Sequence, residues 1–360
     1  MFDFLIIGGG LIGLLTAKEL QKTGANIAVI EKNSPGKQAT WAAGGILSPM
    51  RPWYYSEPVN AISSISQSIY QQLSIELRDE TGIDPEWLPS GMLVLHDNEM
   101  TQAIEWCEQH HSPIKVLTTE ELKTQFNHLT PQKKSAIYRP DVATIRPHKL
   151  LAALNQFLAN NGVTFYNDQE AQKLNINNQA ITSVQLEETT LNAGEYIVCS
   201  GAWSPNLLPE LAEKPNITPV KGQMICFPPT AIANKSMVMD GNRYIIPRKD
   251  GRMVVGSTRE QTGFDASTTQ SAFKALKEFA QQLYPALSHV EPDAHWAGLR
   301  PASPDSIPYI CRVEPYKNLS LNAGHYRNGI VTAPASAELM VDLLLNKNTK
   351  IDPKPYEIKR

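Results

Sequence analysis

The first two hundred residues of this chain contain several short, mostly apolar runs. Residues 4–7 and 27–30 are continuous apolar runs, and residues 162–166 and 196–199 have a similar character. Strands of a parallel sheet are covered on both faces, so they carry apolar residues at nearly every position. The four runs therefore predict neighbouring strands of one buried parallel sheet.

Helically spaced apolar residues separate these runs. This spacing predicts a helix over about 60–81, and another that begins at Pro147 and ends near residue 160. Further helices are expected near 270–283 and over about 335–345, after a stretch of glycine-rich loops.

From residue 219 onward the pattern changes to short alternating segments. Residues 223–227, 244–247 and 253–255 predict strands of an antiparallel sheet, and 181–186 with 190–192 predict a hairpin.

The turn after the first apolar run carries glycines at the spacing of a dinucleotide-binding fingerprint. Gly8 and Gly10 permit a tight turn close to a pyrophosphate, and Gly13 lets the following helix pack on the strand. Glu31 ends the second strand, where its carboxylate can accept hydrogen bonds from a ribose hydroxyl. A glycine-rich turn that binds nothing would leave Glu31 unexplained. The fingerprint predicts an ADP-containing dinucleotide without deciding between NAD and FAD.

These elements predict an α/β protein of two domains, with a parallel nucleotide-binding sheet interrupted by two excursions. The nucleotide domain is expected to comprise residues 1–80, 141–218 and 298–360, and the antiparallel domain residues 81–140 and 219–297.

Composition excludes several classes of protein. The net charge of −3 over 360 residues favours neither nucleic acid nor an anionic membrane. The four cysteines have no metal or redox spacing, and no apolar run approaches the length of a membrane span. We expect a soluble, cytoplasmic protein.

Several further motifs occur in a familiar order: 43–47 (AGGIL), 199–204 (CSGAWS), 298–301 (GLRP) and 324–330 (GHYRNGI). With the N-terminal fingerprint they resemble the FAD-dependent amino acid oxidases of the D-amino acid oxidase superfamily. The resemblance is strongest to the glycine oxidase (ThiO) branch, which is associated with thiamine biosynthesis. It extends to 244–248 (YIIPR) and 256–258 (GST). It implies a Rossmann-like FAD-binding domain of the D-amino acid oxidase (GR2) type with an antiparallel-sheet substrate domain.

The resemblance also implies a reaction. An amine gives an imine by hydride transfer from its Cα to flavin N5, and water hydrolyses the imine to a 2-oxo acid. The reduced flavin then passes its electrons to O2 and forms hydrogen peroxide. The protein's contribution is orientation and electrostatics around the cofactor.

The fingerprint and the resemblance together predict the residues that contact the cofactor. They are Gly8, Gly10, Leu11, Ile12, Gly13, Glu31, Lys32, Thr40, Ala43, Gly44, Gly45, Ile46, Leu47, Ala171, Ser200, Gly201, Trp203, Arg300, His325, Tyr326, Arg327, Asn328, Gly329 and Ile330. Backbone amides at 327–330, with the partial positive charge of the final helix, would stabilise negative charge at the flavin N1–C2=O.

Three residues fall on substrate-binding positions of the family. Arg300 matches the arginine that binds the substrate carboxylate through two parallel hydrogen bonds. Tyr244 matches an active-site tyrosine, and Arg327 a second arginine near substrate and flavin. The alternatives are a surface ion pair for Arg300, which we expect in a loop, and a core position for Tyr244.

Two positions depart from the glycine oxidase pattern. Asn242 stands where those enzymes have histidine, and Arg259 where they have methionine. An inward Arg259 would pair with a second carboxylate and favour an acidic substrate, whereas an outward one would only meet solvent.

The leading interpretation is an FAD-dependent oxidase of glycine, sarcosine or a small D-amino acid, with O2 as the acceptor. One alternative is a dehydrogenase that passes its electrons to a quinone or a protein. Another is a non-catalytic protein that binds a ligand in the same cleft. We expect non-covalent FAD, because Cys311 does not match the attachment site of sarcosine oxidase relatives. The resemblance, rather than any residue, suggests a homotetramer.

Overall fold

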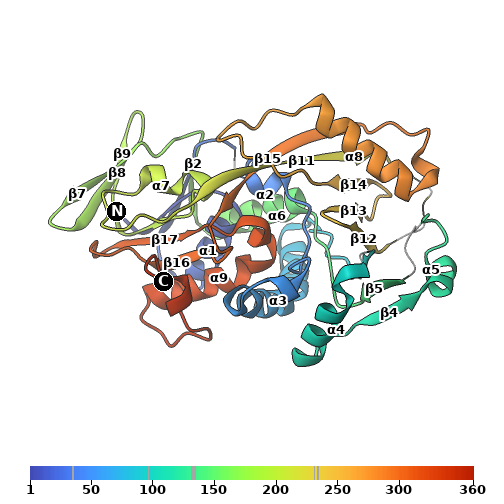
Figure 1. The fold of residues 1–360 in the computed structure, drawn as a ribbon. Coiled ribbons are helices and arrows are strands. Elements are labelled where there is room, and N and C mark those ends of the chain that lie inside the picture. The colour runs from blue at the N-terminus through green and yellow to red at the C-terminus, as the bar shows by residue number, and fades with distance from the viewer. Residues whose placement is uncertain (35, 96, 131–134, 231, 233–234) are drawn as a thin grey trace.

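The computed structural model describes residues 1–34, 36–95, 97–130, 135–230, 232 and 235–360. Figure 1 shows two large sheets side by side, with both chain termini at the parallel sheet. The first has six strands in the order β16-β17-β10-β1-β2-β6. Five are parallel: β1 (Phe2–Ile7), β2 (Ile27–Glu31), β6 (Thr164–Asn167), β10 (Ala193–Val198) and β17 (Leu319–Ala323). The edge strand β16 (Tyr309–Arg312) is antiparallel to β17.

Both faces of the central strands β1, β2, β10 and β17 are buried, as the apolar runs predict, whereas the edge strand β6 is only partly buried. One face packs against helices, and the other against a core that includes the small sheet of β7, β8 and β9. The helices are α1 (Leu11–Gln21), α3 (Glu57–Thr81), α6 (Pro147–Asn160) and α9 (Gly329–Leu344). The small strands are β7 (Lys173–Asn177), β8 (Ala180–Gln185) and β9 (Thr190–Leu191). The expected α/β class and the expected hairpin are therefore confirmed.

The second sheet has eight strands in the order β15-β11-β14-β13-β12-β3-β5-β4, all antiparallel except the pair β12 and β3. Its strands are β3 (Met92–Val94), β4 (Lys115–Thr118), β5 (Ser135–Arg139), β11 (Thr218–Phe227), β12 (Met237–Asp240), β13 (Arg243–Pro247), β14 (Met253–Gly256) and β15 (Ala294–Ala302). Around it lie α4 (Met100–Gln109), α5 (Thr119–Gln125) and α8 (Gln270–Leu283).

The described elements differ from the sequence prediction in the last quarter of the chain. The region expected to form only glycine-rich loops contains β15, β16 and β17. The final helix begins at Gly329, six residues before the expected start. The expected start lay directly after Pro334, whereas the helix continues through this proline. The domain boundaries stay a prediction, and β15 crosses the expected boundary at residue 298.

Two short helices complete the surroundings of the site. They are α2 (Ala39–Ala42), which packs against β15, and α7 (Ser204–Leu207), which follows β10. Among the described residues, no helix has both the length and the apolar character that a bilayer span requires.

Candidate active site

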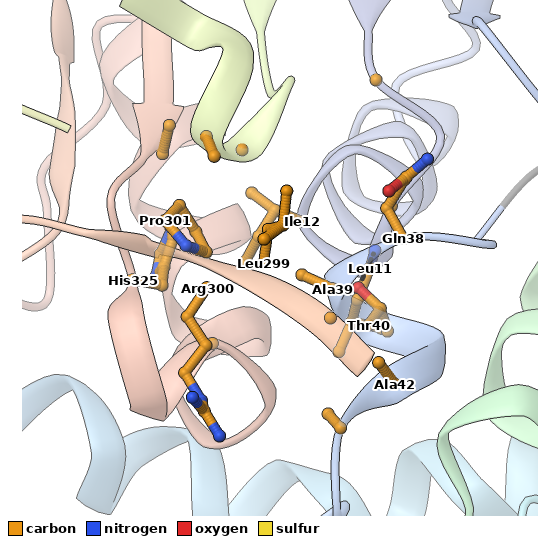
Figure 2. A pocket seen from close by; sticks show the side chains of 18 of the residues that line it. Leu11, Ile12, Gln38, Ala39, Thr40, Ala42, Leu299, Arg300, Pro301 and His325 are labelled. Atoms are coloured by element: carbon orange, nitrogen blue, oxygen red, sulfur yellow. Dashed lines mark hydrogen bonds between the residues drawn. The ribbon is translucent and has the colours of Figure 1, made fainter. Parts of the chain in front are cut away.

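A long cavity of about 540 Å³ lies between the two sheets. Figure 2 shows part of its wall: Leu11 and Ile12 lie beside residues 38–42, and Arg300 projects from β15 near His325. The cavity runs from the carboxyl ends of β1 and β2 to the region around Tyr244. This is where ligands of open α/β sheets bind.

The glycines at one end of the cavity are required by close backbone approach. Gly8 has φ +120°, and a Cβ there would lie 2.4 Å from the carbonyl oxygen of Cys199. A Cβ on Gly13 would lie 2.0 Å from the Gly8 carbonyl oxygen, so Gly13 holds α1 close to β1. Helix α1 begins after Gly10, which supplies no side-chain cap; the Leu11 N–H donates to the Thr40 hydroxyl at 3.2 Å, and the next amides of the first turn are left for an anionic ligand.

Glu31 lies at the end of β2 and lines the same part of the cavity. Its carboxylate accepts hydrogen bonds from the backbone N–H of Gly9 at 2.8 Å and of Asn33 at 3.1 Å. Burial raises the pKa of Glu31, and these two bonds oppose that shift. Each carboxylate oxygen has a lone pair left for a ligand hydroxyl. Next to it, the Lys32 ammonium lies 3.6 Å from the centre of the Trp203 ring.

Of the residues predicted to contact the cofactor, all except Gly13 and Leu47 line the cavity. Gly13 supports the turn from behind, and Leu47 is buried in the helical core. Direct cofactor contact by the lining residues stays a prediction.

Arg300 lies at the opposite end of the cavity, on strand β15 rather than in the loop expected from the sequence. Its guanidinium donates to the Ser257 hydroxyl at 2.7 Å and to the Thr258 carbonyl at 3.2 Å. Burial lowers the pKa of Arg300, Arg327 lowers it further, and Tyr244 opposes the shift. Within the described part of the chain, no carboxylate forms an ion pair with Arg300, so the surface ion pair considered above is not found.

The space for this guanidinium comes from a glycine on the neighbouring strand. In the β11–β15 pairing, Val220 lies opposite Arg300 and Gly222 lies opposite Gly298. A Cβ on Gly222 would lie 2.1 Å from a guanidinium nitrogen of Arg300. The Arg300 side chain therefore lies over the bare backbone of β11.

The other predicted substrate residues occupy different positions. Tyr244 is buried on β13 and lines the cavity, as does the partly exposed Arg327. Asn242 is exposed in the turn before β13 and accepts a hydrogen bond from Arg51. Arg259 is also exposed, with its guanidinium 6.0 Å from the centre of the Tyr326 ring. Asn242 and Arg259 are absent from the cavity wall, so the structure does not place them with Arg300.

The N-terminus of helix α9 lies at the cavity, because Asn328, Gly329 and Ile330 line its wall. Asn328 precedes the helix, is 4% exposed and makes no side-chain cap. His325 is buried beside it, with one ring nitrogen 2.9 Å from the Thr332 hydroxyl and the other 2.9 Å from the Asn322 side-chain oxygen. Burial lowers the pKa of His325 to about 3, so the ring is neutral.

Sequence reasoning missed several residues of the cavity wall. They include Gln38, Ala39, Met50, Gly222, Met224 and Ser257. The alternation of β11 could have placed Gly222 and Met224 on one face. No local pattern indicates Gln38 or Met50, which lie in the segments before and after α2.

Comparisons with known proteins agree with this geometry. A family model described as FAD dependent oxidoreductase matches residues 3–343. The chain is 39% identical to the glycine oxidase of Pseudomonas aeruginosa, over 98% of this chain and 97% of the relative. It is 30% identical to the bifunctional protein ThiO/ThiG of Trichormus variabilis, over 98% of this chain and 53% of that protein. The crystal structure of glycine oxidase from Geobacillus kaustophilus matches with a TM-score of 0.95 at 28% identity, over 100% of this chain and 98% of that one.

Proposed function

Because this chain belongs to the family of FAD-dependent oxidoreductases, we propose that it oxidises glycine or another small amine, with O2 as the acceptor. The amine would be converted to an imine, which water hydrolyses to a 2-oxo acid and ammonia or a primary amine. The oxygen would be reduced to hydrogen peroxide.

The cavity-lining guanidinium of Arg300 carries this proposal. It faces the cavity with its charge unneutralised by any described carboxylate, and its position is fixed by Ser257 and Thr258. A substrate carboxylate meets such a planar cation with two charge-assisted hydrogen bonds. Tyr244, on the adjacent wall, has a hydroxyl that can donate to the same carboxylate.

The donors at the two ends of the cavity fit FAD. Helix α1 offers backbone amides to the pyrophosphate, Glu31 offers carboxylate oxygens to a ribose, and α9 directs its positive end at the flavin region. When bound, FAD supplies the acceptor for the substrate hydride and the route to oxygen. The chain's own residues bind and orient the amine.

The backbone of Gly44 packs closely against the Tyr244 wall of the cavity. A Cβ on Gly44 would lie 2.8 Å from the Ile246 side chain, 3.4 Å from Tyr244 and 3.6 Å from Met224. The exposed position of Arg259 gives no support to an acidic substrate.

The test is a peroxide assay of the purified flavoprotein with glycine, sarcosine, D-alanine, D-proline, D-aspartate and L-amino acids. The proposal predicts peroxide and a 2-oxo acid in equal amounts with glycine or another small amine. Turnover that needs a dye or a quinone would instead indicate a dehydrogenase. A protein that binds no flavin would indicate the non-catalytic alternative.

The remaining proposals concern context. A role in thiamine biosynthesis follows from the glycine oxidase resemblance, and deletion of the gene should then produce a requirement for the thiazole part of thiamine. The cytoplasmic location and the homotetramer stay predictions, which cell fractionation and light scattering can test.

A further inference from the structure

The cavity-lining segment 42–46 has its carbonyl groups held by three separate partners. The Ala42 carbonyl accepts from the Trp296 indole N–H at 3.1 Å, and the Gly44 carbonyl accepts from the Arg248 guanidinium at 2.8 Å. The Gly45 carbonyl accepts from the backbone N–H of Ile145 at 2.8 Å. Trp296 lies on β15, and Arg248 lies in the turn that follows β13. Both strands belong to the eight-stranded sheet.

Arg248 follows strand β13 directly, and alternate residues of this strand meet Gly44. Tyr244 and Ile246 both lie within van der Waals reach of a Cβ built on Gly44. Arg248 continues the series two residues later, with a hydrogen bond in place of an apolar contact. Since side chains alternate along a strand, the three residues share one face. That face joins the Tyr244 side of the cavity to segment 42–46.

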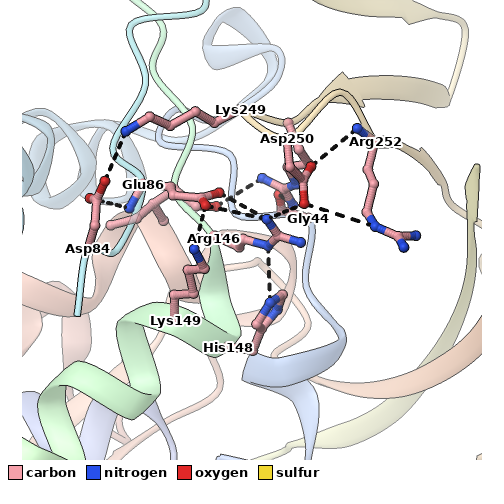
Figure 3. A network of polar contacts seen from close by, with 11 residues as sticks. Gly44, Asp84, Glu86, Arg146, His148, Lys149, Lys249, Asp250 and Arg252 are labelled. Carbon is pink, nitrogen blue, oxygen red and sulfur yellow. Dashed lines mark hydrogen bonds and ion pairs between the residues drawn. The ribbon is translucent and has the colours of Figure 1, made fainter. Parts of the chain in front are cut away.

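The charge of Arg248 is directed at main-chain carbonyls. Its second hydrogen bond goes to the Ile145 carbonyl at 3.1 Å. The neighbouring carboxylates are engaged elsewhere: Glu86 and Asp250 pair with Arg146 at 3.1 and 2.8 Å (Figure 3). Burial and the Arg146 charge lower the pKa of Arg248 to about 10, so it is still protonated at neutral pH.

The hydrogen bond to Gly44 determines the direction of the next amide. A trans peptide is planar, so the Gly45 N–H points opposite to the Gly44 carbonyl and away from Arg248. No hydrogen bond from this N–H is found in the part of the chain that the structure describes. A cation on the carbonyl oxygen also polarises the peptide group and makes its N–H a stronger donor.

We propose that Arg248 is a positioning residue for the flavin: by holding the Gly44 carbonyl it presents the Gly45 N–H to an acceptor atom of the bound flavin ring. This role depends on FAD binding and is independent of which amine is oxidised. It therefore stands or falls separately from the proposed substrate.

The test compares Arg248→Met and Arg248→Lys with the wild type and with Arg252→Met. Arg252 belongs to the same turn but donates to Asp293 at 2.7 Å and does not line the cavity. The measurements are the Kd for FAD of the flavin-free protein, the visible spectrum and the midpoint potential of bound FAD, and the melting temperature.

We expect Arg248→Met to weaken FAD binding roughly tenfold, as for the loss of one hydrogen bond from the Gly45 N–H to the flavin. Its flavin spectrum should change and its midpoint potential should become more negative. Arg248→Lys, which keeps the charge but not the fork of donors, should shift the same quantities less. Arg252→Met should leave them unchanged.

The proposal is overturned if Arg248→Met has the Kd and potential of the wild type, or if Arg252→Met shifts both equally. Should the methionine variant not fold, Arg248→Lys decides: a wild-type spectrum and potential in that variant would also overturn the proposal. A change in melting temperature alone counts against it, because a purely structural role would leave the potential unchanged.

Discussion

Arg300 shows how a single side chain is prepared for its ligand by the backbone around it. Its fork of donors is oriented by Ser257 and Thr258 and lies over Gly222. A lysine would keep the positive charge but lose the two parallel hydrogen bonds to a carboxylate.

We therefore predict that Arg300→Lys raises the KM for the amine about 10- to 100-fold, or roughly 1.4 to 2.8 kcal/mol. Steady-state oxygen consumption measures this. Arg312→Lys is the matched control, because Arg312 pairs with Glu195 at 2.8 Å and is absent from the cavity wall. Equal KM values in both variants would contradict the role given to Arg300.

His325 makes the stability of the fold sensitive to acid, and unfolding experiments can measure this effect without following the reaction. Burial lowers the pKa of His325 in the native state to about 3, from an ordinary value of 6.5. Below pH 6.5 the His325 ring binds a proton in the unfolded chain but stays neutral in the native state. The neutral histidine thus stabilises the fold fully above pH 6.5, and this contribution is lost as the pH falls toward 3, by up to about 1.4 kcal/mol per pH unit.

The His325→Gln variant has no titrating ring at this position, so its unfolded chain takes up no proton there. Urea unfolding of the FAD-saturated protein at pH 7, 6 and 5 should show a shallower loss of stability for His325→Gln than for the wild type. If the free energy of unfolding falls in parallel with pH for the two proteins, His325 has the same pKa in the native and the unfolded state.

At the scale of single residues, the sequence motifs indicated Arg300, Tyr244 and Arg327, because these residues lie in runs that resemble a known family. They did not indicate the direction of a side chain. Asn242 and Arg259 occupy family positions, yet both are exposed in this structure. Gly222 escaped notice because its importance arises from a residue on the strand beside it.

At the scale of the elements, helix α3 supplies hydrogen-bond partners to backbone groups of helix α9 around its internal proline. Pro334 lies inside α9 and has no N–H for the Ile330 carbonyl one turn earlier. The Tyr70 hydroxyl of α3 donates to that carbonyl, and the Ser66 hydroxyl accepts from the Ala335 N–H at 3.0 Å. A proline normally predicts a helix start, which is why the expected helix began too late.

Tyr70→Phe should therefore destabilise the protein by about 1 to 2 kcal/mol, because it leaves a buried carbonyl without a donor. In a Pro334→Ala background the new N–H can bond the Ile330 carbonyl, so the same change should cost less. A double-mutant cycle by urea unfolding measures the difference. If Tyr70→Phe costs the same in both backgrounds, the two side chains are not coupled through this carbonyl.

The pairing of β11 with β15 makes a further prediction. Gly222→Ala would place a methyl group against the Arg300 guanidinium and displace it while the strands stay paired. We expect kcat/KM for the amine to fall about tenfold or more, with FAD retained, since small misplacements at a reacting centre are costly.

The control is Gly194→Ala on β10, where the added Cβ would lie 3.1 Å from the Asp3 carbonyl and outside the cavity wall. Activity of Gly222→Ala at the level of this control would show that Arg300 tolerates the methyl group.

For the whole molecule, the sequence predicted a parallel sheet and an antiparallel sheet, and both are present. The order of their strands was not predictable, because it depends on pairings between segments far apart in the chain. β15 pairs along its whole length with β11, and this pairing brings Arg300 to the cavity. The site is thus a product of the contact between the sheets, and no local motif contains it.

The four thiols bear on how the cofactor is held. All four cysteines are buried, and burial raises the pKa of Cys199 and Cys311 to about 12, which disfavours the reactive thiolate. We predict non-covalent FAD. Acid precipitation of the purified protein should leave the yellow colour in solution, and a yellow pellet would show a covalent bond.

The most direct test of the proposed oxidase is anaerobic mixing of the FAD-bound protein with glycine, followed by admission of air. We expect the visible flavin absorbance to bleach without oxygen and to return in air with release of one peroxide for each amine oxidised. Flavin that keeps its colour with glycine, sarcosine and every small D-amino acid tried would contradict the proposal.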